Sequence, residues 1–163
     1  MIEFSVGMSS YGPLITGLIG LFFAFVLYGL IMRYPAGKSS VVKIGDQIHL
    51  GAKVFMFTEY KILAPVVIVL IVACGLSPLG WYTALAIGVG ALSSAIAGFI
   101  GMYSATKANV RTATAAENSG KEQALSISFF GGSIMGLCVA SMGLVGLGGL
   151  FFYFTQALTD VDQ

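Results

Sequence analysis

The chain has 163 residues, of which 57% are hydrophobic and 9% are charged. Soluble domains carry about 25% charged residues, so this composition excludes a water-soluble globular domain and indicates a membrane protein. The formal net charge of +1 gives no reason to expect nucleic acid as a partner. One histidine and two cysteines are too few for a His/Cys metal cluster, and Cys74 and Cys138 lie in apolar runs, as small buried residues do.

The first predicted span runs from Leu14 to Met32 and contains no charged residue. Its length of about 28 Å matches a hydrocarbon core of about 30 Å. Pro13 suits the first position of a helix, and Pro35 discourages its continuation. The residues before the span carry Glu3 instead of the basic segment of a secretory signal, so we expect the span to be retained.

The second span, residues 55–76, follows a segment of different character. Over residues 41–62, apolar residues recur at intervals of three or four, with lysines and acidic residues between them. This pattern predicts an amphipathic helix that leads into the span. Pro65 is expected to kink this helix near its entry into the membrane. The turn at residues 77–80 ends it, and Trp81 and the following tyrosine are placed as an aromatic belt would be.

The third span is predicted at residues 81–107 and is longer than a bilayer core requires. Ser119 followed by Glu122 has the pattern of a capping box, so we expect the fourth helix to begin there, with its span at residues 122–154. Each of these two helices carries a face of small residues of the kind that lets helices approach closely. We expect these two faces to meet each other, or to meet helices outside this chain. The face of the third helix consists of Gly90, Ser94 and Gly98, continued by Gly101 and Ala105, and that of the fourth consists of Gly132, Gly136 and Ala140.

The predicted fold is therefore an all-α, polytopic transmembrane bundle with four spans. All basic residues fall at or between the first and second spans, or between the third and fourth. By the positive-inside rule, both termini are expected on the outer side of the membrane. We expect a multi-pass protein of the cell's inner (plasma) membrane. These basic residues are Arg33, Lys38, Lys43, Lys53, Lys61, Lys107, Arg111 and Lys121.

Ionisable residues at membrane depth normally mark an ion pathway. None occurs in residues 83–106 or 123–159, which argues against an ion pathway within this chain and against a proteolipid rotor subunit. Gly120 and Lys121 are not a Walker loop, because Lys121 is followed by Glu122 instead of Ser or Thr. From the residues alone we assign no catalytic, cofactor-binding or metal-binding residue.

A few residues near the basic segments have two possible interpretations. Lys107 and Arg111 could extend to lipid headgroups and oppose the negative end of the third helix, or recruit an anion to a site supplied elsewhere. His49 is interpreted as a solvated or interfacial residue rather than a catalyst. Gly131 and Gly132 are interpreted as the start of a packing face rather than a turn that binds a ligand.

Three segments in order resemble the membrane-integral inorganic pyrophosphatases, pumps that couple pyrophosphate hydrolysis to export of protons or sodium ions. The first, Ile48 to Lys61, is similar to the approach to that family's second helix. The second, Ala105 to Ala116, contains the string ANVRTA and resembles the link after its third helix. The third consists of Ala124 and Leu125 followed by GGSIMGL at 131–137, and it resembles the segment that follows this link in the family.

The resemblance implies a chain that forms only the N-terminal portion of such a pump, whose helices form two concentric rings. The aspartate-rich motifs that bind magnesium and pyrophosphate lie on later helices of the family, so no site residue is carried over to this chain. It further implies that these four spans brace the catalytic helices and that the complete pump needs Mg²⁺. The expected partners are the remaining helices of the pump, the lipid bilayer and a second copy in a homodimer.

Two functions stay open at this point. The chain could be the scaffold portion of an ion-pumping pyrophosphatase, which we do not expect to be active alone, and its abrupt end after the fourth span favours a fragment. Alternatively, it could be a self-contained four-helix assembly factor or a small oligomeric channel. The reading frame beyond Gln163 separates them: aspartate-rich membrane segments would support the pump, and a stop codon the second function. Proton or sodium specificity is not encoded in these spans.

Overall fold

The structure is a computed structural model that describes the backbone of residues 2–159 and the side chains of residues 11–156. Within this range the chain forms helices and no strand. Each helix contains an apolar stretch long enough to cross a membrane, so the predicted all-α fold with four spans is confirmed. The helices are α1 (Ile2–Met32), α2 (Ser39–Leu76), α3 (Gly80–Asn118) and α4 (Lys121–Thr159).

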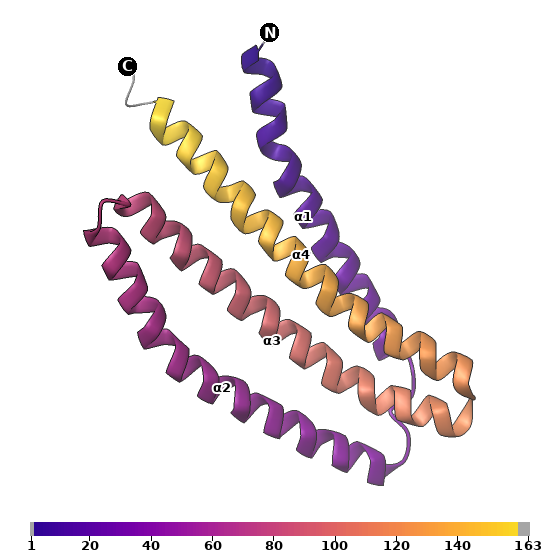
Figure 1. The fold of residues 1–163 in the computed structure, drawn as a ribbon. Helices are drawn as coiled ribbons and strands as arrows, with labels where there is room; N and C mark the ends of the chain where they lie inside the picture. The colour runs from indigo at the N-terminus through magenta and orange to yellow at the C-terminus, as the bar shows by residue number, and fades with distance from the viewer. Residues whose placement is uncertain (1, 160–163) are drawn as a thin grey trace.

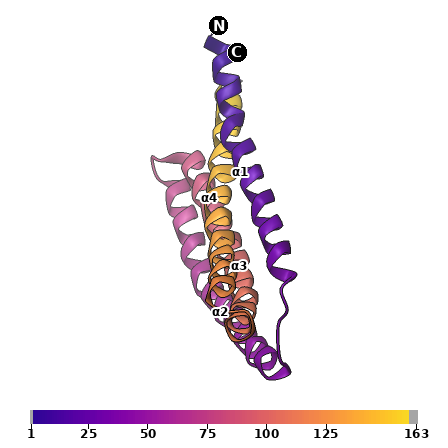
Figure 2. The same ribbon diagram turned by 90° about the vertical axis from the view of Figure 1, so that its right-hand side faces the viewer.

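The helices lie side by side in the order α1, α4, α3, α2 (Figure 1). In the described range α2 packs on α3 alone, and α1 packs mainly on α4. The start of α1 and the end of α4 lie at the same end of the bundle (Figure 1). We call the opposite end, which holds the α1–α2 linker and the α3–α4 turn, the basic end. Figure 2 shows the linker running from the end of α1 to the start of α2.

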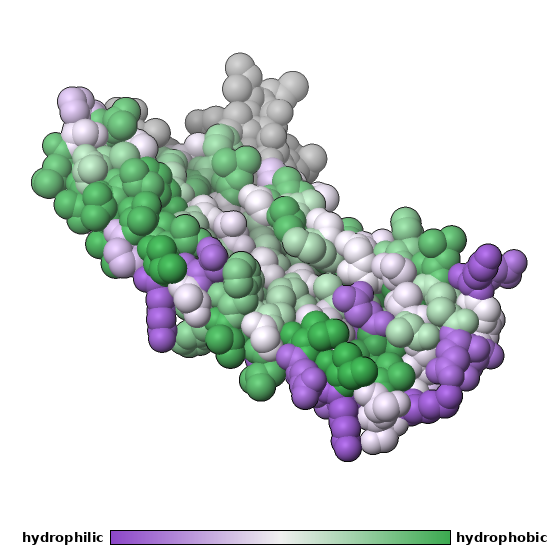
Figure 3. All heavy atoms as spheres, turned by 60° about the horizontal axis from the view of Figure 1, so that its bottom comes forward, coloured by the Kyte–Doolittle hydropathy of each residue, from purple (hydrophilic) through white to green (hydrophobic). Residues whose placement is uncertain are grey.

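A layer that is one helix thick leaves most apolar side chains on its surface. Phe25 is 75% exposed, Leu125 73% and Phe129 72%. Figure 3 shows apolar atoms over much of one face, with hydrophilic residues gathered toward the basic end and fewer elsewhere. Such a surface is stable against lipid or further helices but not against water.

The buried core lies where α1, α3 and α4 approach one another. Ile31, Ile127 and Ile134 are its largest buried side chains. Ala24 and Ala108 belong to the same core, and their small size lets α1 and α3 pack closely on α4.

The helices extend beyond the predicted spans at several ends. Pro13 lies inside α1 instead of at its first position, because the helix already begins at Ile2. Membrane helices tolerate such a proline, since neighbouring groups compensate for the missing hydrogen bond. Pro65 likewise lies inside α2, which remains a single helix and curves along its length (Figure 1). The third helix continues past Lys107 to Asn118, because its polar residues there pack on the linker.

The predicted capping box at Ser119 is wrong. The Ser119 amide donates to the carbonyl of Ala115 at 2.8 Å, so this residue closes α3. Gly120 then reverses the chain with φ +90°, a conformation that favours glycine, and α4 begins at Lys121. The carbonyl of Gly120 accepts the first bond of α4, from the Ala124 amide.

The two predicted small faces do not meet each other, and the alternative, that they meet helices outside this chain, stays a prediction. No atom lies within 4 Å of where a Cβ would stand on Gly90, Gly132 or Gly136. Of the face predicted on α3, Gly101 does contact α4, where a Cβ would lie 2.8 Å from Met135. On α4 the close contact falls one position before Gly132, where a Cβ on Gly131 would lie 2.7 Å from Ala108. Gly131 therefore is a packing residue, as predicted, whereas Gly132 faces open space.

Candidate functional site

The polar residues at the basic end of α3 hold the linker between α1 and α2. Arg111, Thr114 and Glu117 recur every three residues, so they lie along one side of the helix. Each of them contacts a residue of the linker, and the contacts follow the order of the linker residues along the chain. We call these three residues the linker clamp.

Arg111 is a buried member of the linker clamp, with 8% of its surface exposed. Its Nε donates to the carbonyl of Tyr34 at 3.1 Å, and one terminal nitrogen donates to the carbonyl of Lys107 at 3.0 Å. The prediction that this side chain extends to lipid headgroups is therefore wrong. The physical reason is that the linker carbonyls have no helical partner, and a buried guanidinium satisfies them with charge-assisted bonds.

Thr114 holds the middle of the linker. Its Oγ1 donates to the carbonyl of Ala36 at 2.9 Å. Gly37 has φ +87°, and a Cβ there would lie 2.2 Å from Thr114 Oγ1. Both the backbone conformation and the close approach thus require glycine. The third contact is the ion pair of Lys38 with Glu117, which is exposed and so contributes little stability.

A second group of polar contacts joins α2 to α3. Thr106 Oγ1 donates to the carbonyl of Tyr103, so its lone pairs accept the bond from His49 Nδ1 at 2.7 Å. The His49 ring also packs edge-on against the ring of Tyr103, with 4.8 Å between centroids. His49 is therefore half-buried in a helix contact instead of facing solvent.

Two more contacts fix the position of α2. Lys107 Nζ lies 3.6 Å from a carboxylate oxygen of Asp46, so this lysine pairs with α2. Nearer the other end, the hydroxyl of Tyr60 donates to the carbonyl of Ala95 at 2.6 Å. Since α2 contacts α3 alone in the described range, these bonds set its place in the layer.

These arrangements bind backbone groups and neighbouring helices. In the part of the chain that the structure describes, no group of three or more His, Cys, Asp or Glu side chains could hold a metal ion. Cys74 and Cys138 are free thiols, half-buried and buried. That the chain carries no catalytic, cofactor-binding or metal-binding residue stays a prediction.

Sequence reasoning missed the linker clamp although one signal was present. The spacing of Arg111, Thr114 and Glu117 places them on one side of a helix that is otherwise rich in alanine. What the spacing cannot reveal is their partners, because backbone carbonyls of an irregular linker leave no pattern in the sequence.

Comparison with known proteins agrees with this architecture. The family model described as "Inorganic H+ pyrophosphatase" matches residues 18–163. The chain is 37% identical over 144 residues to a K(+)-insensitive pyrophosphate-energized proton pump of Methanosarcina mazei, an alignment that covers 88% of this chain and 21% of the relative. It is 36% identical over 147 residues to a K(+)-stimulated pyrophosphate-energized sodium pump of Thermotoga maritima, covering 90% and 20%.

A third relative, a K(+)-insensitive pyrophosphate-energized proton pump of Pyrobaculum aerophilum, is 35% identical over 162 residues, which are 95% of this chain and 22% of that pump. The chain thus spans about a fifth of the length of the curated relatives that it matches. The family match covers nearly the whole chain, including all three segments that carried the resemblance. On these grounds the chain belongs to the inorganic H+ pyrophosphatase family.

Proposed function

We propose that these four helices form the N-terminal part of a pump in the cell's inner membrane that hydrolyses pyrophosphate to export protons or sodium ions. Family membership and the names of the relatives support this proposal. The four candidate spans suit a membrane pump. Relatives of both ion types match at similar identity, so the choice of ion lies outside this comparison.

Within that pump, the role of these helices is to hold and brace rather than to react. The observation that supports this role is that the polar side chains at the basic end of α3 bind the linker and α2. Arg111 and Thr114 donate to linker carbonyls, and Lys107 pairs with Asp46. Groups engaged in this way fix α1, α2 and α3 relative to one another and leave the chemistry to other helices.

The proposed partners are the remaining helices of the pump, the lipid bilayer and a second copy of the pump in a homodimer. The layer is one helix thick, and its exposed apolar faces are suited to contact helices or lipid. Mg²⁺ would serve the complete pump by offsetting the charge of pyrophosphate. Among the described residues, no group of three or more His, Cys, Asp or Glu side chains could hold this ion.

The test uses the complete polypeptide that contains these helices, expressed in membrane vesicles. We expect magnesium-dependent hydrolysis of pyrophosphate together with pyrophosphate-driven uptake of protons or sodium ions. A pH-sensitive dye and radioactive sodium distinguish the two ions. Absence of both hydrolysis and uptake in a folded protein would refute the proposed function.

A further inference from the structure

His49 is the only histidine of the chain, and it precedes the apolar stretch of α2 at residues 55–76. Its Nδ1 donates to Thr106 Oγ1 at 2.7 Å, because the hydroxyl hydrogen of Thr106 is already donated to the carbonyl of Tyr103. Nδ1 therefore carries a hydrogen in this contact, and Nε2 is the atom that can gain or lose a proton. The imidazole can thus change its charge without losing the hydrogen bond to α3.

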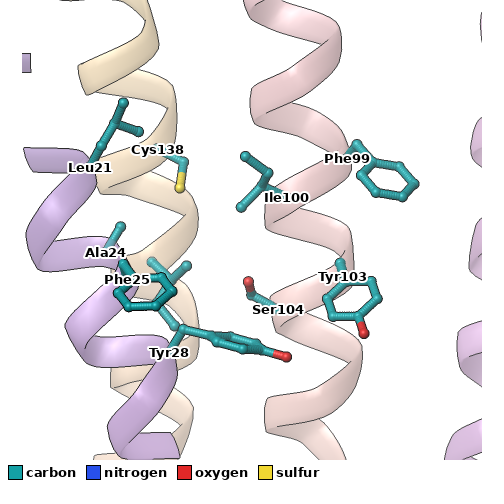
Figure 4. Close-up of a pocket in the computed structure, with 10 residues that line it drawn as sticks. Leu21, Ala24, Phe25, Tyr28, Phe99, Ile100, Tyr103, Ser104 and Cys138 are labelled. Carbon is teal, nitrogen blue, oxygen red and sulfur yellow. The ribbon is translucent and has the colours of Figure 1, made fainter. Parts of the chain in front are cut away.

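The ring of Tyr103 shields the imidazole on one side. The two rings meet edge-on, with 4.8 Å between their centroids. Tyr28 extends from α1 toward α3, and its ring centroid lies 6.4 Å from that of Tyr103 (Figure 4). Contacts with rings of two other helices limit the freedom of Tyr103 to turn away, so part of the imidazole stays out of water.

The charged groups around His49 are mostly positive. Lys53 follows it by four residues and Asp46 precedes it by three, so both are its neighbours on the surface of α2. The Lys53 ammonium lies 5.8 Å from the centre of the Tyr103 ring that His49 also contacts. From α3, the one helix that packs on α2 in the described range, comes Lys107, whose ammonium lies 3.6 Å from the Asp46 carboxylate. A proton on Nε2 would therefore add a third positive charge to a group that contains one carboxylate.

These surroundings lower the pKa of His49. Partial burial is the largest cause, repulsion by Lys107 and then by Lys53 adds to it, and attraction by Asp46 opposes it. An imidazole that leaves the contact regains the pKa of a free histidine, about 6.5. Because the pKa is lower in the docked state, docking has its full stability above this pH and loses stability as the pH falls toward the docked pKa.

We propose that His49 makes the docking of residues 39–54 on α3 sensitive to pH. While the imidazole is neutral, the hydrogen bond to Thr106 and the contact with Tyr103 hold this segment in place. A proton on Nε2 places an additional positive charge beside Lys53 and Lys107 and loosens the segment. The segment lies at the basic end, which the positive-inside rule predicts to be cytoplasmic, so the signal is a fall in cytoplasmic pH. Histidine is the side chain whose ordinary pKa suits such a signal.

The first test measures the pKa of His49 by NMR. The chain is placed in nanodiscs of phosphatidylcholine, and isotope-labelled histidine gives a single titrating imidazole. We expect a pKa below that of free histidine, and Lys53→Gln should raise it because a nearby positive charge is removed. Lys61→Gln is the matched control, because it removes the same charge about two turns further along α2, and it should leave the pKa unchanged. A pKa at or above that of free histidine, or an equal effect of the two variants, would overturn the proposal.

The second test follows docking in the complete polypeptide that contains these helices, with its native cysteines replaced. Spin labels at Gln47→Cys and Ala116→Cys, both at exposed positions, report the distance between α2 and α3 by double electron–electron resonance. Between about pH 7.5 and about pH 5.5, where histidine titrates, a second and longer distance should appear. The ratio of undocked to docked protein should rise by at most about tenfold per pH unit, the limit for one proton. His49→Gln keeps an amide donor for Thr106 but cannot gain a charge, so it should keep the short distance at both pH values.

A second pair of labels separates local undocking from unfolding. Leu70→Cys and Leu92→Cys lie further along the same two helices, both positions are exposed, and the distance between them should not change. The proposal is overturned if the first pair keeps one distance, if His49→Gln responds to pH as the unchanged protein does, or if both pairs change together. These outcomes leave the pump assignment untouched, because they do not measure hydrolysis.

Discussion

The linker clamp should make a measurable contribution to stability through Thr114. Thr114→Val keeps the shape of the side chain but removes the bond from its Oγ1 to the carbonyl of Ala36, which is 2.9 Å long. A neutral hydrogen bond contributes about 1 kcal/mol net, and a carbonyl left without a partner adds a further cost. Ala36 is half-buried, so water can replace part of the lost bond. We therefore expect the free energy of unfolding to fall by about 1–2 kcal/mol.

The chain provides a matched control two residues away. Thr112 lies on the same helix, and its Oγ1 is buried with no hydrogen-bond partner among the described residues. Thr112→Val makes the same chemical change in the same helix but removes a hydroxyl that gains nothing from burial. Its free energy of unfolding should stay unchanged or rise.

Thermal unfolding followed with a thiol-reactive dye suits this comparison. Cys138 is 2% exposed, so it reacts only when the bundle opens, and Cys74→Ala removes the other thiol of the chain. We expect a lower midpoint for Thr114→Val and an unchanged or higher midpoint for Thr112→Val, both in the Cys74→Ala background. Equal losses in the two variants would refute the inference that the hydrogen bond to the linker is what Thr114 contributes.

Further predictions concern the helix contacts and use the same unfolding assay. Gly131→Ala should destabilise the bundle by about 1–3 kcal/mol, because the new Cβ would lie 2.7 Å from Ala108. Gly132→Ala, with no atom within 4 Å, should be neutral or stabilise by up to about 1 kcal/mol; equal losses from both would contradict the observed packing. Tyr60→Phe removes the bond to the Ala95 carbonyl and should cost about 1 kcal/mol. An unchanged midpoint would show that this bond does not stabilise α2 on α3.

The number and type of helices could be predicted from the sequence because a helix that crosses the hydrocarbon core of a membrane must be apolar along that length. Four apolar stretches gave four helices, and the resemblance carried by residues 105–116 led to the family that the comparison shows. Helix ends were harder to predict. Pro13 and Ser119 have the local chemistry of helix starts, but one lies within α1 and the other closes α3. Local propensity is weak wherever packing and neighbouring helices decide.

Helix faces were harder still, because composition does not reveal what lies opposite. Gly132 and Gly136 share the spacing of a packing motif, yet both face open space, and Gly131 makes the contact with α3 instead. A rotation of one residue is invisible in a pattern of small residues that covers several sides of the helix. Arg111 was interpreted from its charge and its place near the end of the third helix. Its burial depends on a linker whose path cannot be read from the sequence.

The most direct test of the structural role asks what this chain does by itself. The purified chain is placed in liposomes, and magnesium-dependent pyrophosphate hydrolysis and cation flux are measured beside the complete polypeptide. We predict hydrolysis and ion transport by the complete polypeptide, and neither by the four helices alone. Pyrophosphate turnover or cation conduction by the chain of 163 residues would contradict the account.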